Sequence, residues 1–345
     1  MSASARSYYR PLVQVGPQRP AHALSLAGGW GWFTDVEVLQ RGQAPSVVPV
    51  AEIPVAAQDA LTTPRADIAG LTMDRPRIMG ILNATPDSFS DGGVHEAAED
   101  AIASGIAMRD SGVDILDIGG ESTRPGAETI APGVEIARTE PIVAGLRAAG
   151  VASLISIDTR KAEVAAAALA AGAGLINDVS GFTYDPALTP LAAQSDAPIC
   201  VMHALGDPAT MQQDPRYDDV LLDVYDFLER QIETLVAAGI AKDRIIADPG
   251  IGFGKTLEHN LALLARLSVF HSLGVPVLLG ASRKRFIGTV GKAPEASSRA
   301  PGSIAVALAA VSHGIQILRV HDVAQTWQAL ALWQASMTGK AEVEG

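Results

Sequence analysis

Cysteine is almost absent from this 345-residue chain, which contains a single thiol, at Cys200. One cysteine excludes an internal disulfide and a cysteine-rich zinc site, and this usage is typical of a protein kept in a reducing cytosol. We therefore expect a cytoplasmic protein, in which Cys200 is a small buried hydrophobic residue of a strand.

Positive charge is also scarce, because 26 Lys and Arg stand against 38 Asp and Glu, which leaves a net charge of −12. Nucleic acids and anionic membranes select net-positive proteins, so neither is expected as a partner. A polyanionic substrate would need a local basic pocket. The length allows two medium domains or one large domain with an appendage.

Long apolar runs suited to a membrane are missing too. The start of the chain has no apolar segment of the kind found in secretory signals. The longest charge-free run, 300–318, is interrupted by proline, glycine, serine, histidine and glutamine. It predicts a buried helix followed by a buried strand rather than a membrane span.

Residues 1–75 differ in amino-acid composition from the rest of the chain. Proline and glycine are frequent there, aromatic residues lie close together, and the pieces 36–39 and 46–50 favour β-structure. We predict a small β-rich N-terminal extension over 1–75, with no assigned function, followed by one domain over 76–345.

From residue 77 onward, a short run rich in Ile, Val and Leu is followed by a longer Ala-rich helical stretch, and the pair repeats. Candidate strands cover 77–83, 113–118, 153–158, 174–178, 198–202, 244–248, 275–279 and 315–319. Candidate helices cover 96–111, 134–149, 161–172, 186–195, 218–238, 257–273, 297–313 and 322–337. This pattern favours a closed α/β (β/α)8 TIM barrel over the alternative, an open doubly wound sheet.

Each predicted strand ends in a group able to do chemistry. These groups are Asn83, Asp117, Asp158, Asn177, Asp178, His203, Asp248, Ser282, Lys284, Arg319 and His321. In a (β/α)8 barrel the carboxyl ends of the strands meet on one face, where active sites lie. A single polar strand end is an ordinary turn residue, whereas the whole series predicts an active site.

Seven segments around these strand ends carry a family resemblance. They read I-L-N-A-T-P-D-S-F-S-D-G-G (81–93), G-G-E-S-T-R-P-G-A (119–127), S-I-D-T (156–159), I-N-D-V-S-G (176–181), D-P-G-I-G-F-G-K (248–255), S-R-K (282–284) and R-V-H-D-V (319–323). Their order and positions resemble dihydropteroate synthases over residues 77 to about 325. The resemblance implies a transferase of folate biosynthesis, which joins 4-aminobenzoate to (7,8-dihydropterin-6-yl)methyl diphosphate and gives 7,8-dihydropteroate and diphosphate. It also implies Mg2+ as cofactor and a homodimer.

A reduced pterin presents a 2-amino group, an N3–H and a 4-oxo group along one edge, so it needs a paired acceptor and a donor. The resemblance assigns Asp248 as the paired acceptor and Lys284 as the donor. It assigns Asn177 to the opposite ring edge and Asp158 to the polar floor. The remaining implied pterin contacts are Met202, Gly252 and Phe253.

The diphosphate needs cationic groups and hydrogen-bond donors in a net acidic chain. Arg319 and His321 alternate on one strand, so their side chains point the same way, and arginine suits bidentate phosphate contacts. The implied diphosphate contacts are Asn83, Thr123, Arg124, Arg319 and His321. Asn83 can also offer its side-chain oxygen to Mg2+, which usually keeps several waters and binds substrate phosphates.

The aminobenzoate pocket and the catalytic groups are likewise assigned by resemblance. The implied aminobenzoate contacts are Phe89, Arg124, Pro125, Ser282 and Lys284. Because the pterin ring can delocalise charge at its methylene carbon, we expect a dissociative route with carboxylates beside the cation. The implied catalytic residues are Asp91, Asp158 and Lys284. Loops 84–93 and 123–130 have the glycine and proline content of lids that order over substrates.

Two further segments give weaker signals. Residues 250–256 look like a phosphate loop, but Pro249 stands where the first glycine is required, so they predict a flexible strand-end loop that lets the backbone approach the flat pterin ring. The acidic stretch 218–233 predicts a solvated helix face.

Two alternatives remain open at this point. A barrel methyltransferase that binds methyltetrahydrofolate would share the pterin-recognition carboxylates but would not need Arg319 and His321 for a diphosphate. A non-catalytic pterin-binding homologue would be expected to lack residues such as Asn83, Asp91 or Lys284, all of which are present.

Overall fold

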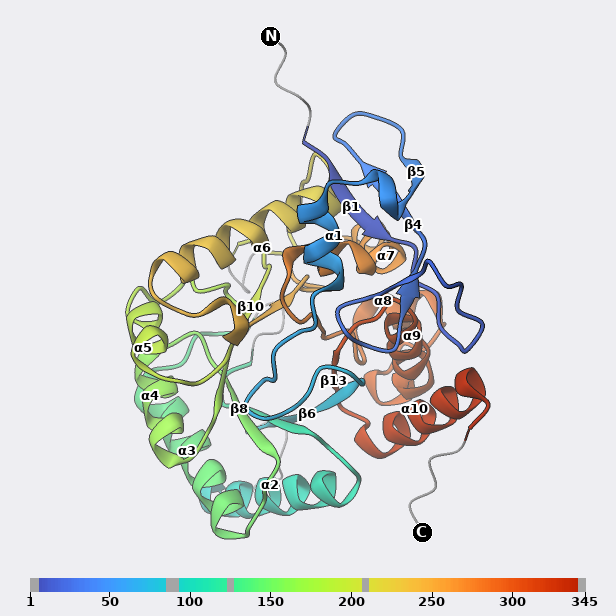
Figure 1. Ribbon diagram of the computed structural model, residues 1–345. Coiled ribbons are helices and arrows are strands. Elements are labelled where there is room, and N and C mark those ends of the chain that lie inside the picture. The colour runs from blue at the N-terminus through green and yellow to red at the C-terminus, as the bar shows by residue number, and fades with distance from the viewer. Residues whose placement is uncertain (1–5, 85–92, 123–126, 207–210, 341–345) are drawn as a thin grey trace.

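The computed structural model describes residues 6–84, 93–122, 127–206 and 211–340, with side chains left undescribed at 93–96. Helices follow one another in chain order around a central ring of strands, from α2 (Gly93–Asp110) to α10 (Val323–Thr338) (Figure 1). The first segment of the chain, in blue, lies beside one side of this ring.

Eight parallel strands form the ring. They are β6 (Arg77–Asn83), β7 (Ile115–Gly119), β8 (Leu154–Asp158), β9 (Leu175–Asp178), β10 (Ile199–Met202), β11 (Ile245–Asp248), β12 (Leu278–Leu279) and β13 (Ile317–Val320). β13 returns to β6 with Ile317 opposite Arg77, and a parallel bridge from Ala247 to Val277 joins β11 to β12. The ring is therefore closed, and the predicted (β/α)8 barrel is confirmed over the open sheet.

The helices between the strands agree with the predicted ranges, with two differences. They are α2, α3 (Pro132–Ala148), α4 (Ala162–Ala171), α5 (Leu188–Gln194), α6 (Val220–Ala237), α7 (Leu257–Ala265), α9 (Ala300–Ser312) and α10. The single helix predicted over 257–273 ends at Ala265, where Arg266 leaves helical geometry, and continues as the 3-10 helix η4 (Leu267–Leu273). A short helix, α8 (Arg285–Val290), was not predicted, since its glycine and β-branched residues have low helix propensity.

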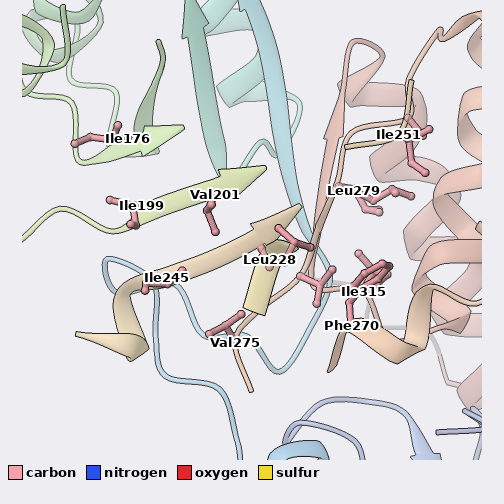
Figure 2. Close-up of a cluster of buried hydrophobic side chains, with 14 of the residues drawn as sticks. Ile176, Ile199, Val201, Leu228, Ile245, Ile251, Phe270, Val275, Leu279 and Ile315 are labelled. Carbon is pink, nitrogen blue, oxygen red and sulfur yellow. The ribbon is translucent and has the colours of Figure 1, made fainter. Parts of the chain in front are cut away.

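Two apolar layers hold the barrel together. A cluster of inward-facing strand residues fills its interior, and Cys200 is wholly buried there, as expected. A larger cluster lies between the strands and the helices. Figure 2 shows part of it, with Ile199 and Val201 on β10 and with Phe270 of η4 beside Ile315. The barrel is thus a packed core, as such barrels are, and not a pore.

The N-terminal extension has its own small β-structure, as predicted. β1 (Tyr8–Pro11), β4 (Asp35–Leu39) and β5 (Ser46–Pro49) form an antiparallel sheet, and β2 (Leu24–Ser25) pairs with β3 (Trp32–Phe33). A small apolar core forms between these strands and α1 (Val55–Thr62). Further on, Ile68 and Met73 join the apolar cluster inside the barrel, so residues 65–75 pack differently from the sheets before them.

The extension binds the acidic side of α6, which corrects the prediction of a solvated face. Arg41 donates to Asp223 and to Asp226, at 2.6 Å each. The Tyr8 hydroxyl donates to Asp226 Oδ1 at 2.9 Å, and its ring meets the Tyr225 ring edge-on at 5.2 Å. The distance in sequence between residue 41 and residue 226 explains why a local pattern could not show these pairs.

No helix among the described residues is both long enough and apolar enough to cross a bilayer.

Candidate active site

Side chains alternate along each strand, and this alternation selects which strand-end residues enter the barrel mouth. The interior cluster includes Ile115, Leu175, Cys200, Ile246 and Ile317. Two residues further along each of these strands stand, in order, Asp117, Asn177, Met202, Asp248 and Arg319. Asn83 and Asp158 stand four residues beyond Met79 and Leu154 of the same cluster, so the alternation places them inside as well. Apolar side chains therefore fill the interior below, and polar ones complete it at the carboxyl ends.

Two predicted strand-end residues, Asp178 and His203, stand one position out of step with these residues, so their side chains point away from the barrel interior. Asp178 accepts from the backbone N–H groups of Ser180 and Phe182, at 2.7 Å each, so it organises the turn after β9. His203 contacts Lys255. Asp178 is thus held by local structure and His203 by a tertiary contact, and neither belongs to the polar floor of the mouth.

Arg319 lies between two carboxylates at the centre of the mouth. Its Nε donates to Asp117 Oδ2 and its Nη2 donates to Asp158 Oδ2, at 2.6 Å each. Burial raises the pKa of Asp158 to about 7, although the nearby charge of Arg319 opposes the rise. The other oxygen of Asp158, Oδ1, is buried with no hydrogen-bond partner in the described structure. An acceptor is therefore left for a ligand.

Asp117 was predicted only as a polar strand end, and the structure gives it a definite position. It is wholly buried. Besides Arg319 it contacts Asn177, whose Nδ2 lies 3.2 Å from Oδ2 and 3.4 Å from Oδ1. Asp117 thus connects two predicted ligand-binding residues from β9 and β13. The strand-end pattern contained this residue, but its partners depend on the closed ring.

Asp248 and Lys284 form the other half of the mouth. Asp248 Oδ1 accepts from the Gly250 N–H at 2.7 Å, and burial raises the pKa of its carboxyl group. Burial also lowers the pKa of Lys284 to about 7, against the opposing charge of Asp248. The Lys284 amine donates to the Ile251 carbonyl oxygen and lies 4.2 Å from the centre of the Phe253 ring. These are the residues predicted to bind the pterin edge.

Met202 and Gly252, two further residues of the predicted pterin set, lie beside Asp248 and Lys284. Met202 is buried at the end of β10, opposite Asp248 in the parallel register. A Cβ atom at Gly252 would lie 2.9 Å from Cδ of Lys284, so the glycine gives the lysine stem room. The described members of the predicted pterin set are therefore brought together.

Ser282 and His321 were predicted in different subsites, and the structure places them in contact. His321 Nδ1 lies 3.0 Å from the Ser282 hydroxyl oxygen, and the His321 backbone N–H donates to the same oxygen at 3.2 Å. The carboxyl ends of β12 and β13 are thus tied together. Ser282 contributes to holding His321.

Several predicted residues lie outside the described part of the chain. They are Phe89, Asp91, Thr123, Arg124 and Pro125. Asn83 is described, half-buried at the end of β6. Within the described ranges no cluster of three or more His, Cys, Asp or Glu side chains could hold a metal.

A buried ionic cluster beside the mouth was not predicted. The Lys161 amine donates to Glu121 Oε1 at 2.9 Å, to Glu135 Oε2 at 2.7 Å and to the Ile130 carbonyl at 2.8 Å. Arg160 Nε donates to Glu121 Oε2 at 3.1 Å. The chain around residue 121 is thereby joined to the chain around residue 130. The signal in the sequence was a pair of basic residues, two and three positions after Asp158.

Comparisons with known proteins agree with this geometry. Residues 79–321 match the family described as pterin binding enzyme, so the chain belongs to the pterin-binding enzymes. The dihydropteroate synthase of Neisseria meningitidis serogroup B is 48% identical over 268 residues, covering 76% of this chain and 93% of the relative. That of Escherichia coli K12 is 43% identical over 270 residues, covering 78% and 95%. Within its class the chain is therefore a member of the dihydropteroate synthase family.

Solved structures point the same way. The dihydropteroate synthase of Xanthomonas albilineans with 4-aminobenzoic acid has a TM-score of 0.74 and 48% identity, covering 80% of this chain and 98% of that chain. A structure of that enzyme in complex with 7,8-dihydropteroate has a TM-score of 0.70 and 42% identity, covering 79% and 98%. These likenesses favour the synthase over the methyltransferase that the strand ends left open.

Proposed function

We propose that the barrel mouth carries out the dihydropteroate synthase reaction, in which 4-aminobenzoate and (7,8-dihydropterin-6-yl)methyl diphosphate give 7,8-dihydropteroate and diphosphate. The protein is a transferase of folate biosynthesis. The observation that carries the proposal is the convergence of Asp158, Asn177, Asp248 and Lys284 on one polar floor. Their donors and acceptors match the edges of a pterin.

Recognition of the pterin follows from these groups. Asp248 accepts the 2-amino and N3 hydrogens through its carboxylate, and Lys284 donates to the 4-oxo oxygen. Asn177 pairs with the opposite edge, and the buried Oδ1 of Asp158 gains there the partner it otherwise lacks. The remaining proposed contacts to the ring are Met202, Gly252 and Phe253.

The diphosphate is proposed to bind beside Arg319. Two of the N–H groups of Arg319 are engaged by Asp117 and Asp158, and a guanidinium has five. His321, tied to Ser282, stands two residues further on the same strand. The full proposed set for this group is Asn83, Thr123, Arg124, Arg319 and His321.

The mouth also fits Mg2+, the proposed cofactor. Asn83 ends β6 and supplies the kind of neutral oxygen that Mg2+ accepts, and Mg2+ characteristically takes few protein ligands beside phosphates. Bound there with the substrate, Mg2+ would stabilise the negative charge of the departing diphosphate. Asn83 is half-buried at this position, so the protein does not enclose it completely.

The proposed chemistry needs no strong base. The bond from the pterin methylene carbon to the diphosphate oxygen breaks, and its electron pair leaves with the diphosphate. The arylamine nitrogen then forms the new bond to carbon and loses one proton to solvent. Asp158 and Asp91 stabilise the cationic carbon, and Lys284 holds the ring. The proposed pocket for the aminobenzoate comprises Phe89, Arg124, Pro125, Ser282 and Lys284.

The direct test is to mix the purified protein with both substrates and Mg2+ and to measure diphosphate release together with 7,8-dihydropteroate. We expect release that requires 4-aminobenzoate and stops when Mg2+ is chelated. No product above background with both substrates and Mg2+ present would overturn the proposal, and binding of the pterin without turnover would favour the non-catalytic homologue.

Two further properties are proposed from the resemblance. The protein is a homodimer that associates through its helical shell, and it works in the cytoplasm, where the single thiol Cys200 stays reduced. Sedimentation equilibrium tests the first property, with a monomer as the contrary outcome. Fractionation of cells tests the second.

A further inference from the structure

The segment that joins β11 to α7, residues 249–256, is wound tightly and is called the glycine loop here. Gly250, Gly252 and Gly254 have φ values of +67°, +83° and +61°, a region that favours glycine. A Cβ atom at Gly250 would lie 1.8 Å from the His203 carbonyl oxygen, and one at Gly254 would lie 2.6 Å from Cβ of Leu205. The loop is therefore pressed against the chain that leaves β10.

Lys255 turns back into the space enclosed by this loop. Its side chain is buried, with 3% of the residue exposed. The amine lies 2.9 Å from the Gly250 carbonyl oxygen, 3.0 Å from that of Phe253 and 2.8 Å from His203 Nδ1. These contacts are made within the protein, so the amine acts on the loop and not on solvent.

Either protonation state of Lys255 satisfies this geometry. A charged amine donates to both carbonyl oxygens and to His203 Nδ1, and a neutral amine donates to the carbonyls and accepts from an Nδ1–H. Removing the amine would take this partner from His203 Nδ1 and the Phe253 carbonyl, and would leave the Gly250 carbonyl with only the Phe253 N–H, at 3.1 Å. Such groups are costly, so the loop would change its path to satisfy them.

His203 is itself fixed from its other sides. Its ring meets the Phe227 ring edge-on at 4.9 Å and lies 6.0 Å from the Tyr217 ring. The Tyr217 hydroxyl in turn donates to the Gly254 carbonyl oxygen at 2.8 Å. His203, which contacts the Lys255 amine, is therefore held in a fixed position.

The outer surface of the same loop faces the pterin site. The Gly250 N–H binds Asp248, the Ile251 carbonyl accepts from Lys284, and the Phe253 ring lies beneath the Lys284 amine. The two carbonyls that bind Lys255 flank the one that binds Lys284. A shift of the loop would therefore move the side chains that read the pterin edge.

We propose that Lys255 is a positioning residue of the pterin site: its buried amine holds the glycine loop in the path that places Phe253 and Lys284 against the pterin. The proposal rests on the proposed function, since it takes the Asp248 and Lys284 side of the mouth as the pterin side. Lys255 touches no substrate and acts through the loop.

The test uses the full-length Lys255→Met variant, in which methionine keeps an apolar stem and removes the donors. Equilibrium binding of 6-hydroxymethylpterin and steady-state kinetics with both substrates and Mg2+ are measured. We expect the pterin dissociation constant and the KM for the pterin diphosphate to rise about tenfold or more. The KM for 4-aminobenzoate should change by less than about threefold, because Lys284 is the one described member of its proposed pocket that binds the glycine loop.

A matched control and a second pair of variants protect the result against simple unfolding. Lys242→Met removes an exposed lysine outside the mouth and should leave both constants unchanged. His203→Asn and His203→Ala both lose the ring, but only Asn restores an acceptor near the Nδ1 position. We expect Asn to bind 6-hydroxymethylpterin more tightly than Ala, by about threefold or more.

The outcomes separate this proposal from the proposed function. A folded Lys255→Met variant with unchanged pterin binding, or with both KM values raised equally, would overturn the positioning role. If Lys255→Met fails to fold, equal pterin binding by the two His203 variants would overturn it instead. A wild-type protein that binds the pterin but releases no diphosphate would refute the synthase reaction alone, and pterin binding would still decide the role of Lys255.

Discussion

The N-terminal extension and the barrel mouth both use an arginine that bridges two carboxylates, and in both places the contacts are 2.6 Å long. In the extension, Arg41 bridges Asp223 and Asp226 with 41% of its side chain exposed. In the mouth, Arg319 is 19% exposed and one partner, Asp117, is fully buried. Exposed pairs contribute little to stability, while buried ones carry a desolvation cost and shifted pKa values. The same arginine–carboxylate geometry therefore has a different consequence in each region: the exposed bridge fixes the extension on α6, and the buried bridge shifts the pKa values of groups in the mouth.

The strongest test of this contrast is Asp248→Asn in the mouth. The amide would present a donor to the pterin's own donors, so we expect kcat/KM for the pterin diphosphate to fall about 100- to 1,000-fold. Burial raises the pKa of Asp248, so its charge costs the folded state near neutral pH and the variant should unfold no more easily. Kinetics and urea unfolding check both parts. Retained activity, or a large loss of stability, would contradict the assigned role.

Removing residues 1–64 tests the other region. This deletion keeps Ile68 and Met73, which pack inside the barrel, and removes the partners of α6. We expect the melting temperature to fall by about 5 °C, which corresponds to roughly 3–4 kcal/mol for a chain of this size. The kcat and both KM values measured at 25 °C should stay within about twofold. A large loss of activity in the folded, shortened protein would show that the extension serves the site.

The next largest effect is expected in the pH dependence of stability, which should reveal the buried carboxylate of the mouth. Asp158 has a folded pKa raised to about 7, against about 4 for an unfolded chain. Between these two pH values the folded protein still holds the proton on Asp158, whereas the unfolded chain has released it. The free energy of unfolding contributed by this residue is therefore fully present at low pH and is lost as the pH rises towards 7. Between pH 5 and pH 7, wild type should lose about 2–3 kcal/mol relative to Asp158→Asn. Denaturant unfolding at both pH values measures the difference, and parallel curves would contradict it.

The smallest effect is expected from Tyr8→Phe at the docking surface. The substitution removes the hydroxyl that donates to Asp226 and keeps the ring against Tyr225. We expect a loss of about 1 kcal/mol in unfolding free energy and unchanged kinetics. Paired with Phe227→Leu on the barrel side of α6, the two effects should add if the regions are independent. Changed kinetics in Tyr8→Phe alone would show coupling between the docking surface and the mouth.

Much of the barrel and part of the site could be predicted from local patterns. Repeating strand and helix segments indicated the fold, and Asp158, Asn177 and Asp248 were identified by standing at strand ends. Lys255 received no role in the predicted flexible loop, because a glycine-rich run shows nothing about which way its lysine turns. Similarly, α6 looked like a solvated helix, since the arginine that covers its acids lies far away in sequence.

The sequence by itself determined the order of the elements and the set of chemical groups at the strand ends, because strand periodicity and turn composition are local properties. Only the tertiary structure decided the pairing of those groups. Asp117 meets Arg319 across 202 positions, and Lys255 meets His203 across 52. Such contacts depend on how the closed ring sets the register of its strands and on which acceptors burial leaves without water, and neither is a property of any one segment.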